Sequence, residues 1–284
     1  MEVSNDGGCL YVVATPIGNL GDISARAIEV LSGSDLVAAE DTRHSGRLLR
    51  HLGIERPLLA LHEHNERERL GGILERLAQG QRIALVSDAG TPLISDPGYP
   101  LVRACHEAGY RVSPVPGPSA MVAALCVSGL PTDHFEFRGF VPRRESSRRS
   151  LLESAARASA TQVLYESSHR IVDSLQEMRA FFGGDRQLTL CRELTKLHET
   201  VRMGSLDELL AWVRGDPNQR KGEFVLVVAG APAAESAHED ALDPVLRVLL
   251  GEGLPLRQSA AIAARLVGGK KNLAYQRALQ IRQE

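Results

Sequence analysis

The sequence has few aromatic residues and lacks any long apolar run. Phe, Trp and Tyr make up 4% of the 284 residues, with a single tryptophan, so stacking on nucleic-acid bases would depend on isolated rings such as Tyr275. No apolar run reaches the roughly 20 residues that a membrane span needs. The polar, acidic start from Met1 to Gly8 does not have the pattern of a secretory signal. We therefore expect a cytoplasmic protein without a membrane partner.

Closely spaced cysteines and a large net charge are also absent. The four cysteines (Cys9, Cys105, Cys126 and Cys191) are far apart and form no C-x-x-C motif, which indicates reduced, buried thiols. A net charge of −2 gives no whole-molecule attraction to nucleic acid, so any basic surface must be local. The hydrophobic content of 43% is enough for the cores of the two domains that 284 residues suggest.

The most informative stretch is the loop 87–98, which lies between the strand-like run 82–86 and a helical pattern over 100–107. The loop contains two glycines, two prolines, two carboxylates and three hydroxyls. A strand, a Gly/Pro-rich loop and a helix form ligand sites at the carboxyl ends of strands in open α/β sheets. Because Gly admits a ligand close to the backbone and Pro fixes the loop, a binding loop is favoured over a polar turn.

Three other strand-like runs end in polar or Gly/Pro-rich segments. These segments are 15–22, 40–44 and 116–120. Segment 15–22 lacks the G-x-G-x-x-G dinucleotide motif. Segment 40–44 either lines a site or only caps a helix. The alternation of strand and helix patterns predicts an α/β domain with a mainly parallel sheet over residues 1–129.

Two histidines and two glutamates follow the short apolar run 58–61. Zinc-binding histidines on a helix are spaced i and i+4, whereas His62 and His64 are two apart, and no further ligand follows at a matching distance. A polar loop is therefore favoured over a metal centre, and no metal site is predicted.

Residues 130–231 are expected to form a second α/β domain. Strand-like runs near 188–203 and 224–229 follow one another with little helix between them, which indicates a mixed sheet. Five arginines and one glutamate occur between Arg138 and Arg149, and this segment either starts a solvated helix or binds RNA phosphates.

Residues 232–284 are predicted to form a linker and a small helical tail. From Asp240 onward the tail has seven Lys/Arg and four Asp/Glu. Its last two helical patterns resemble a helix-turn-helix RNA-contact module, and a packing or dimerisation arm is the alternative.

Taken in order, the loops resemble those of the tetrapyrrole (corrin/porphyrin) methylase superfamily. The similar segments are VATPIGNLGD (13–22), AEDTR (39–43), DAGTPLISDPG (88–98) and PGPSA (116–120). The small-molecule members usually have a G-x-G-P-G-D loop where this chain has 15–22, and a G-D-P turn where it has Asp88-Ala89-Gly90. Both departures favour the branch that methylates ribosomal RNA.

The resemblance implies S-adenosylmethionine-dependent methylation of a cytidine 2′-hydroxyl in the decoding region of small-subunit ribosomal RNA. It also implies a homodimer, with the assembled small subunit as the expected substrate. Two alternatives remain: a precorrin-type tetrapyrrole C-methyltransferase, and a non-catalytic ribosome-binding protein that keeps the cofactor pocket.

The resemblance further implies which residues contact the cofactor: Pro16, Asp88, Gly90, Thr91, Gly117, Pro118, Ser119, Ala120, Tyr165 and Leu194. Candidates for a base, or for a cation near the forming alkoxide, stand at strand ends: Glu166, Lys196, Glu193 and Asp41. A buried ion pair would explain any one of them equally well. RNA contacts are expected at Arg43, Arg143, Arg144, Arg170, Lys270 and Lys271.

Overall fold

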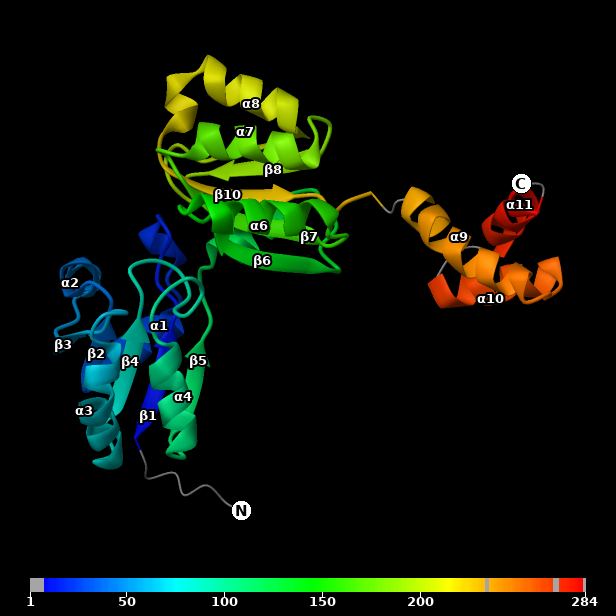
Figure 1. Cartoon of the computed structure of the whole chain (residues 1–284). Coiled ribbons are helices and arrows are strands. Elements are labelled where there is room, and N and C mark those ends of the chain that lie inside the picture. Colours follow the sequence, from blue (N-terminus) through cyan, green and yellow to red (C-terminus); the bar gives the residue numbers. More distant parts are fainter. Residues whose placement is uncertain (1–7, 233–234, 268–270, 283–284) are drawn as a thin grey trace. The chain divides into compact units, whose positions relative to one another are not determined.

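The computed structural model describes residues 8–232, 235–267 and 271–282. These residues form two compact units. One unit contains two five-stranded sheets and their helices, and the other contains residues 157–159 and the chain from Gly230 onward (Figure 1).

The first sheet is parallel throughout, with strand order β3-β2-β4-β1-β5. Its strands are β1 (Cys9–Val13), β2 (Leu36–Ala39), β3 (Leu58–Ala60), β4 (Arg82–Val86) and β5 (Arg111–Val115). Its helices are α1 (Ala25–Ser32), α2 (Thr42–His51), α3 (Glu66–Ala78), α4 (Tyr99–Glu107) and α5 (Ala120–Val127). The parallel sheet predicted from the alternation of patterns is confirmed.

Alternate residues of these strands build a core on each face of the sheet, because successive side chains point to opposite sides. Val13 and Val37 pack with α1 and α2, whereas Leu10 and Ile83 pack with α3 and α4. Both faces are therefore covered, which explains why the inner strands β2 and β4 are almost entirely apolar. The parallel arrangement brings the polar loops that follow β1, β2, β4 and β5 to the same edge.

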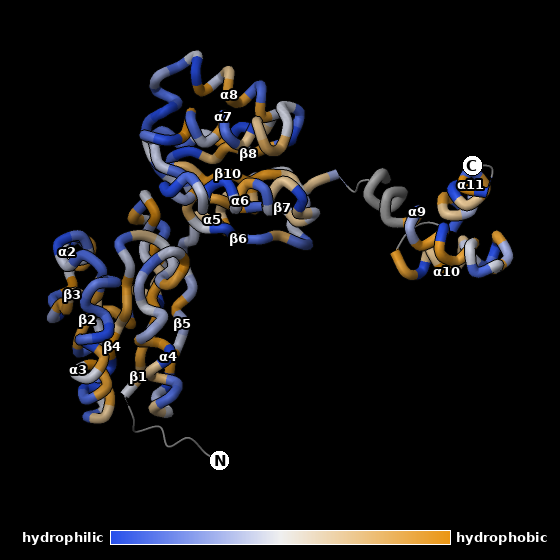
Figure 2. The backbone as a smooth tube through the Cα atoms, viewed as in Figure 1, coloured by the Kyte–Doolittle hydropathy of each residue, from blue (hydrophilic) through white to orange (hydrophobic). Residues whose placement is uncertain are grey.

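The second sheet has the order β6-β7-β10-β8-β9 and is mixed, as predicted. Only β6 and β7 run parallel, and the other pairs are antiparallel. Its strands are β6 (Phe135–Phe140), β7 (Thr161–Ser167), β8 (Gln187–Arg192), β9 (Thr200–Ser205) and β10 (Glu223–Val228). The central strand β10 is hydrophobic and appears largely orange in Figure 2.

Helices cover both faces of this second sheet. One face packs against α6 (Glu145–Arg157), α7 (Ile171–Phe182) and α8 (Leu206–Gly215). The other packs against α5, which follows the last strand of the first sheet and so joins the two halves. The expectation of four buried thiols was wrong at Cys126, which is exposed on α5, because only one side of this helix meets the sheet.

The C-terminal unit contains three helices around its own small core. They are α9 (Glu235–Gly251), α10 (Leu256–Val267) and α11 (Lys271–Ile281). Leu242 and Leu246 pack against alanines of α10 and α11, and these small side chains let the helices approach closely. No helix in the described part of the chain combines the length and the apolar character that crossing a bilayer demands.

Candidate functional site

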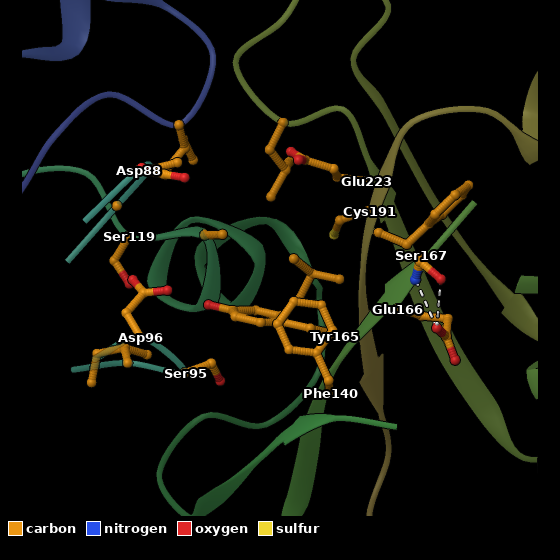
Figure 3. A pocket seen from close by; sticks show the side chains of 18 of the residues that line it. Asp88, Ser95, Asp96, Ser119, Phe140, Tyr165, Glu166, Ser167, Cys191 and Glu223 are labelled. Atoms are coloured by element: carbon orange, nitrogen blue, oxygen red, sulfur yellow. Dashed lines mark hydrogen bonds between the residues drawn. The ribbon is translucent and has the colours of Figure 1, made fainter. Parts of the chain in front are cut away.

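A cavity of about 530 Å³ opens where the loops of the first sheet meet strand ends of the second (Figure 3). Seven of the ten residues expected to contact the cofactor line it: Asp88, Gly90, Thr91, Ser119, Ala120, Tyr165 and Leu194. The other three, Pro16, Gly117 and Pro118, do not line it. The structure therefore brings together residues that are up to 106 positions apart in the sequence.

The loop after β4 is tied to its neighbours on both sides. Thr15 and Gly90 exchange two backbone hydrogen bonds of 2.9 and 3.0 Å. Gly90 has φ = +84°, a conformation that glycine adopts without strain. The Thr91 hydroxyl donates to the carbonyl oxygen of Pro118 at 3.0 Å. Pro118 therefore anchors the loop that lines the cavity, although Pro118 itself is not part of the lining.

Three carboxylates, Glu40, Asp88 and Asp96, lie on the side of the cavity formed by the first sheet. Burial raises the pKa of Glu40, and the charge of Asp88 adds to the effect. Burial raises the pKa of Asp96 to about 6; the Ser87 hydroxyl opposes this shift, whereas the charges of Glu40 and Asp88 increase it. This concentration of negative charge makes the wall favourable for a cationic ligand.

Tyr165 forms much of the opposite wall. Its ring contacts Phe137 and Phe140 edge-on, with ring centroids 4.9 and 5.3 Å apart. Its hydroxyl accepts a hydrogen bond from the Met121 N–H at 3.1 Å, and burial raises its pKa. These contacts fix the phenol at the start of α5.

Of the four acid–base candidates, Lys196 and Glu166 line the cavity. Lys196 Nζ donates to Glu193 at 2.9 Å and to Glu223 at 2.7 Å. Burial acts to lower the pKa of Lys196, but the hydrogen bonds that it donates to Glu223 and Glu193 outweigh burial and raise the pKa. Lys196 is therefore an ammonium cation and not a base. Glu193 does not itself line the cavity.

Glu166 is buried, and its carboxylate is occupied by structural partners. It accepts hydrogen bonds from the Ser167 N–H at 2.7 Å and from the Ser174 hydroxyl, and Arg170 lies 3.7 Å away. Because neighbouring strand residues face opposite sides, Tyr165 points into the cavity and the Glu166 carboxylate points away from it (Figure 3).

Asp41 lies outside the cavity lining and caps α2. It accepts from the Arg43 N–H at 2.8 Å and pairs with the Arg43 guanidinium at 2.9 Å. The hydrogen bond from that guanidinium holds the pKa of Asp41 well below its usual range.

The residues expected to contact RNA are spread over several surfaces. Arg170 donates to the carbonyl oxygens of Val141 and Pro142 at 2.8 and 3.1 Å, so it closes the turn after β6. Arg143 and Arg144 are exposed just before α6, and Lys271 is exposed at the start of α11. Lys270 lies outside the described residues.

His62 and His64 lie 5.9 Å apart between ring centroids and do not line the cavity. Within residues 8–232, 235–267 and 271–282, no group of three or more His, Cys, Asp or Glu side chains is arranged to hold a metal ion.

Several lining residues were not nominated from the sequence: Ile17, Glu40, Asp96, Phe140, Cys191, Glu223 and Val225. Glu40 and Asp96 belong to loops that the sequence did single out, so their position after a strand was the available signal. Phe140, Cys191 and Val225 are apolar strand residues, which nothing in the pattern separates from core residues.

The chain matches two family profiles. Residues 9–210 match "Tetrapyrrole (Corrin/Porphyrin) Methylases", and residues 236–282 match "RsmI C-terminal HTH domain". Two solved structures share the fold. A uroporphyrin-III-C-methyltransferase from Thermus thermophilus has a TM-score of 0.55 at 23% identity, covering 78% of this chain and 94% of that one. The methyltransferase CobJ has a TM-score of 0.59 at 20% identity, covering 79% and 95%.

Curated relatives are similar along nearly their whole length. Proteins named "Ribosomal RNA small subunit methyltransferase I" from Pseudomonas aeruginosa and Haemophilus influenzae are 54% and 51% identical, over 275 and 270 residues. The alignments cover 96% and 95% of this chain, and 97% and 95% of the relatives. The chain therefore belongs to the tetrapyrrole methylase family, within the group of ribosomal RNA small subunit methyltransferase I proteins.

Proposed function

We propose that this protein transfers a methyl group from S-adenosylmethionine to the 2′-hydroxyl of a cytidine in small-subunit ribosomal RNA. The observation that carries the proposal is the cavity where the loop after β4 faces the ends of β7, β8 and β10, in a chain about half identical to methyltransferases named for this RNA. We also expect a cytoplasmic homodimer that acts on the assembled small subunit.

The residues of the cavity fit S-adenosylmethionine. Its volume of about 530 Å³ lies within the range usual for small-molecule sites. Glu40 and Asp88 would attract the sulfonium and ammonium charges, and Ile17 and Leu194 offer apolar surface for the adenine ring. When bound, the sulfonium supplies an activated methyl group, so the protein contributes mainly positioning.

A polynucleotide substrate is supported by the mouth of the same cavity. Phe140 lines it, yet its side chain is 57% exposed while its ring rests against Tyr165. An exposed aromatic ring of this kind offers a face on which an unstacked base can lie. The ammonium group of Lys196 would stabilise negative charge on the ribose oxygen or on a neighbouring phosphate.

The test is transfer of labelled methyl groups to small ribosomal subunits from cells that lack the enzyme. Free ribosomal RNA and a precorrin-type tetrapyrrole are assayed in parallel, and labelled RNA is digested to nucleosides. We expect label in 2′-O-methylcytidine. Label in the tetrapyrrole alone would assign the other branch of the family, and cofactor binding without any transfer would indicate a ribosome-binding protein that is not an enzyme.

A further inference from the structure

Among the carboxylates at or beside the cavity, most already have a close partner. Glu166 is held by Ser167 and Ser174, Glu193 and Glu223 share Lys196, and Asp41 pairs with Arg43. Asp88 accepts a hydrogen bond from the Asp41 N–H at 3.1 Å. Three cavity carboxylates, Glu40, Asp88 and Asp96, have no ion pair within the described residues.

Asp96 is the one of these three that faces the second sheet. Figure 3 shows its carboxylate directed toward Ser119 and the phenol of Tyr165. The charge of Asp96 is also among the causes that raise the Tyr165 pKa. Glu40, in contrast, is surrounded by the charges of Asp88, Glu63 and Asp41 on its own side.

The loop that carries Asp96 is held in an uncommon backbone conformation. Leu93 and Ser95 have φ values of +73° and +67°, which cost energy for residues with a side chain. The loop ends at Gly98 with φ = +126°, where an added Cβ would stand 2.8 Å from Leu85 and 3.3 Å from Leu93. The strained turn is thus fixed at its far end, and it projects Ser95 and Asp96 into the cavity.

We propose that Asp96 is the general base that accepts the proton of the hydroxyl being methylated; this rests on the proposed function. A nucleobase stacked on Phe140 would place the ribose of the same nucleotide beside Tyr165, and therefore beside Asp96. The hydroxyl proton passes to the Asp96 carboxylate as the ribose oxygen forms its bond to the methyl carbon. The carbon–sulfur bond breaks, and its electron pair stays on sulfur as a neutral thioether. The proton is released to water after the product leaves.

The surroundings of Asp96 suit this role. A carboxylate that is partly desolvated, with its pKa raised to about 6, is ionised at neutral pH and more basic than an ordinary aspartate. Besides burial, the groups that set the Asp96 pKa are Ser87 and Asp88 at the end of β4 and Glu40 at the end of β2, and the phenol of Tyr165 on β7 feels the charge of Asp96 in turn. Lys196 and Glu223 are the other charged side chains of the lining, and Glu166 also lines the cavity but turns its carboxylate toward Ser174.

The experiment compares Asp96→Asn with the wild type in single-turnover methylation of small subunits at saturating S-adenosylmethionine. We expect the rate to fall at least about 100-fold, while the S-adenosylmethionine dissociation constant measured by calorimetry changes less than about tenfold. Asp185→Asn is the matched control. Asp185 is exposed just before β8, whereas Lys196 follows the other end of that strand. A rate within threefold of wild type, or loss of cofactor binding, would overturn the proposal.

A second variant tests the role by its pH profile. The wild-type rate should fall below about pH 6. Since the Ser87 hydroxyl lowers the pKa of Asp96, Ser87→Ala should move this acid limb to higher pH, which a purely structural role would not do. Infrared difference titration should detect protonation of the Asp96 carboxylate over the same pH range, without turnover. An unmoved limb contradicts the proposal, whereas a wild type that binds the cofactor but methylates no RNA contradicts the proposed function instead.

Discussion

The side chain of Lys196 lies directly across Gly18. A Cβ built on Gly18 would stand 2.3 Å from Lys196 Cγ, which is far inside van der Waals contact. The loop after β1 and the loop after β8 therefore meet at a point where only glycine leaves room. The lysine continues past this contact to its two carboxylate partners, Glu193 and Glu223.

Gly18→Ala should displace Lys196 and lower methylation. A methyl group at residue 18 cannot coexist with the present path of the lysine, and a displacement of about 1 Å at a catalytic site costs up to about 100-fold in rate. We expect a loss of about tenfold or more in kcat/KM on small subunits. Gly71→Ala on α3, where no atom lies within 4 Å of the added carbon, should retain activity. Equal activity of the two variants would show that the lysine path is unimportant.

Lys196→Met should reduce methylation more than Lys196→Arg does, because methionine leaves the Glu193 and Glu223 carboxylates facing one another without a cation. The pKa of Lys196 is raised from its ordinary value, which is about 10.4. Wild-type activity should therefore show no loss from lysine deprotonation between pH 7 and 10. A rate that falls near pH 8 in the wild type but not in Lys196→Arg would contradict this assignment.

Glu166→Ala should lower the free energy of unfolding by about 2 kcal/mol, since it leaves Ser174, the Ser167 N–H and Arg170 without their buried acceptor. Urea denaturation measures this value. The control is Glu153→Ala, which removes a partly exposed pair with Arg149 on α6 and should cost less than about 1 kcal/mol. If Glu166→Ala keeps full stability but loses methylation, Glu166 has a role in the chemistry instead.

Asp96→Asn should stabilise the protein at neutral pH. The folded-state pKa is raised to about 6, against about 3.9 in an unfolded chain, so the folded state binds more protons between these values. The penalty for ionised Asp96 is therefore absent below pH 4 and complete above pH 6. Allowing for screening of this half-buried group, we expect a gain of about 1 kcal/mol at pH 7.5 and none at pH 4. Equal stability changes at both pH values would contradict the raised pKa.

Arg144→Gln should weaken binding to ribosomal RNA evenly across sequences. The arginine is exposed before α6. Loss of one phosphate contact makes the slope of log K against log salt concentration shallower by about 0.7 to 1. Filter binding over a range of salt concentrations measures the slope. Arg111→Gln, also exposed but at the start of β5, is the charge-matched control. An unchanged slope in Arg144→Gln would place RNA elsewhere on the surface.

Much of the fold could be predicted from the sequence because local signals determine it. Apolar runs of strand length, Gly/Pro-rich loops and helical periodicity are properties of adjacent residues, and they located β1, β2, β4, β5 and the parallel sheet. The mixed second sheet followed in the same way, from strands that are not separated by helices. The loops 87–98 and 116–120 were recognised because runs of glycine, proline and hydroxyl residues have few purely structural uses.

The roles of the charged residues depended on tertiary contacts. Glu166 and Lys196 looked equivalent in the sequence, since each follows a strand. The alternation of side chains along β7 turns the Glu166 carboxylate toward Ser174, whereas the turn after β8 carries Lys196 over Gly18 into the cavity. Asp96 lies in the loop after β4 and Phe140 ends β6, and they line one cavity only because the halves pack through α5. The sequence alone determined which segments fold and which loops line the cavity; packing decided which carboxylates pair with a cation and which have none.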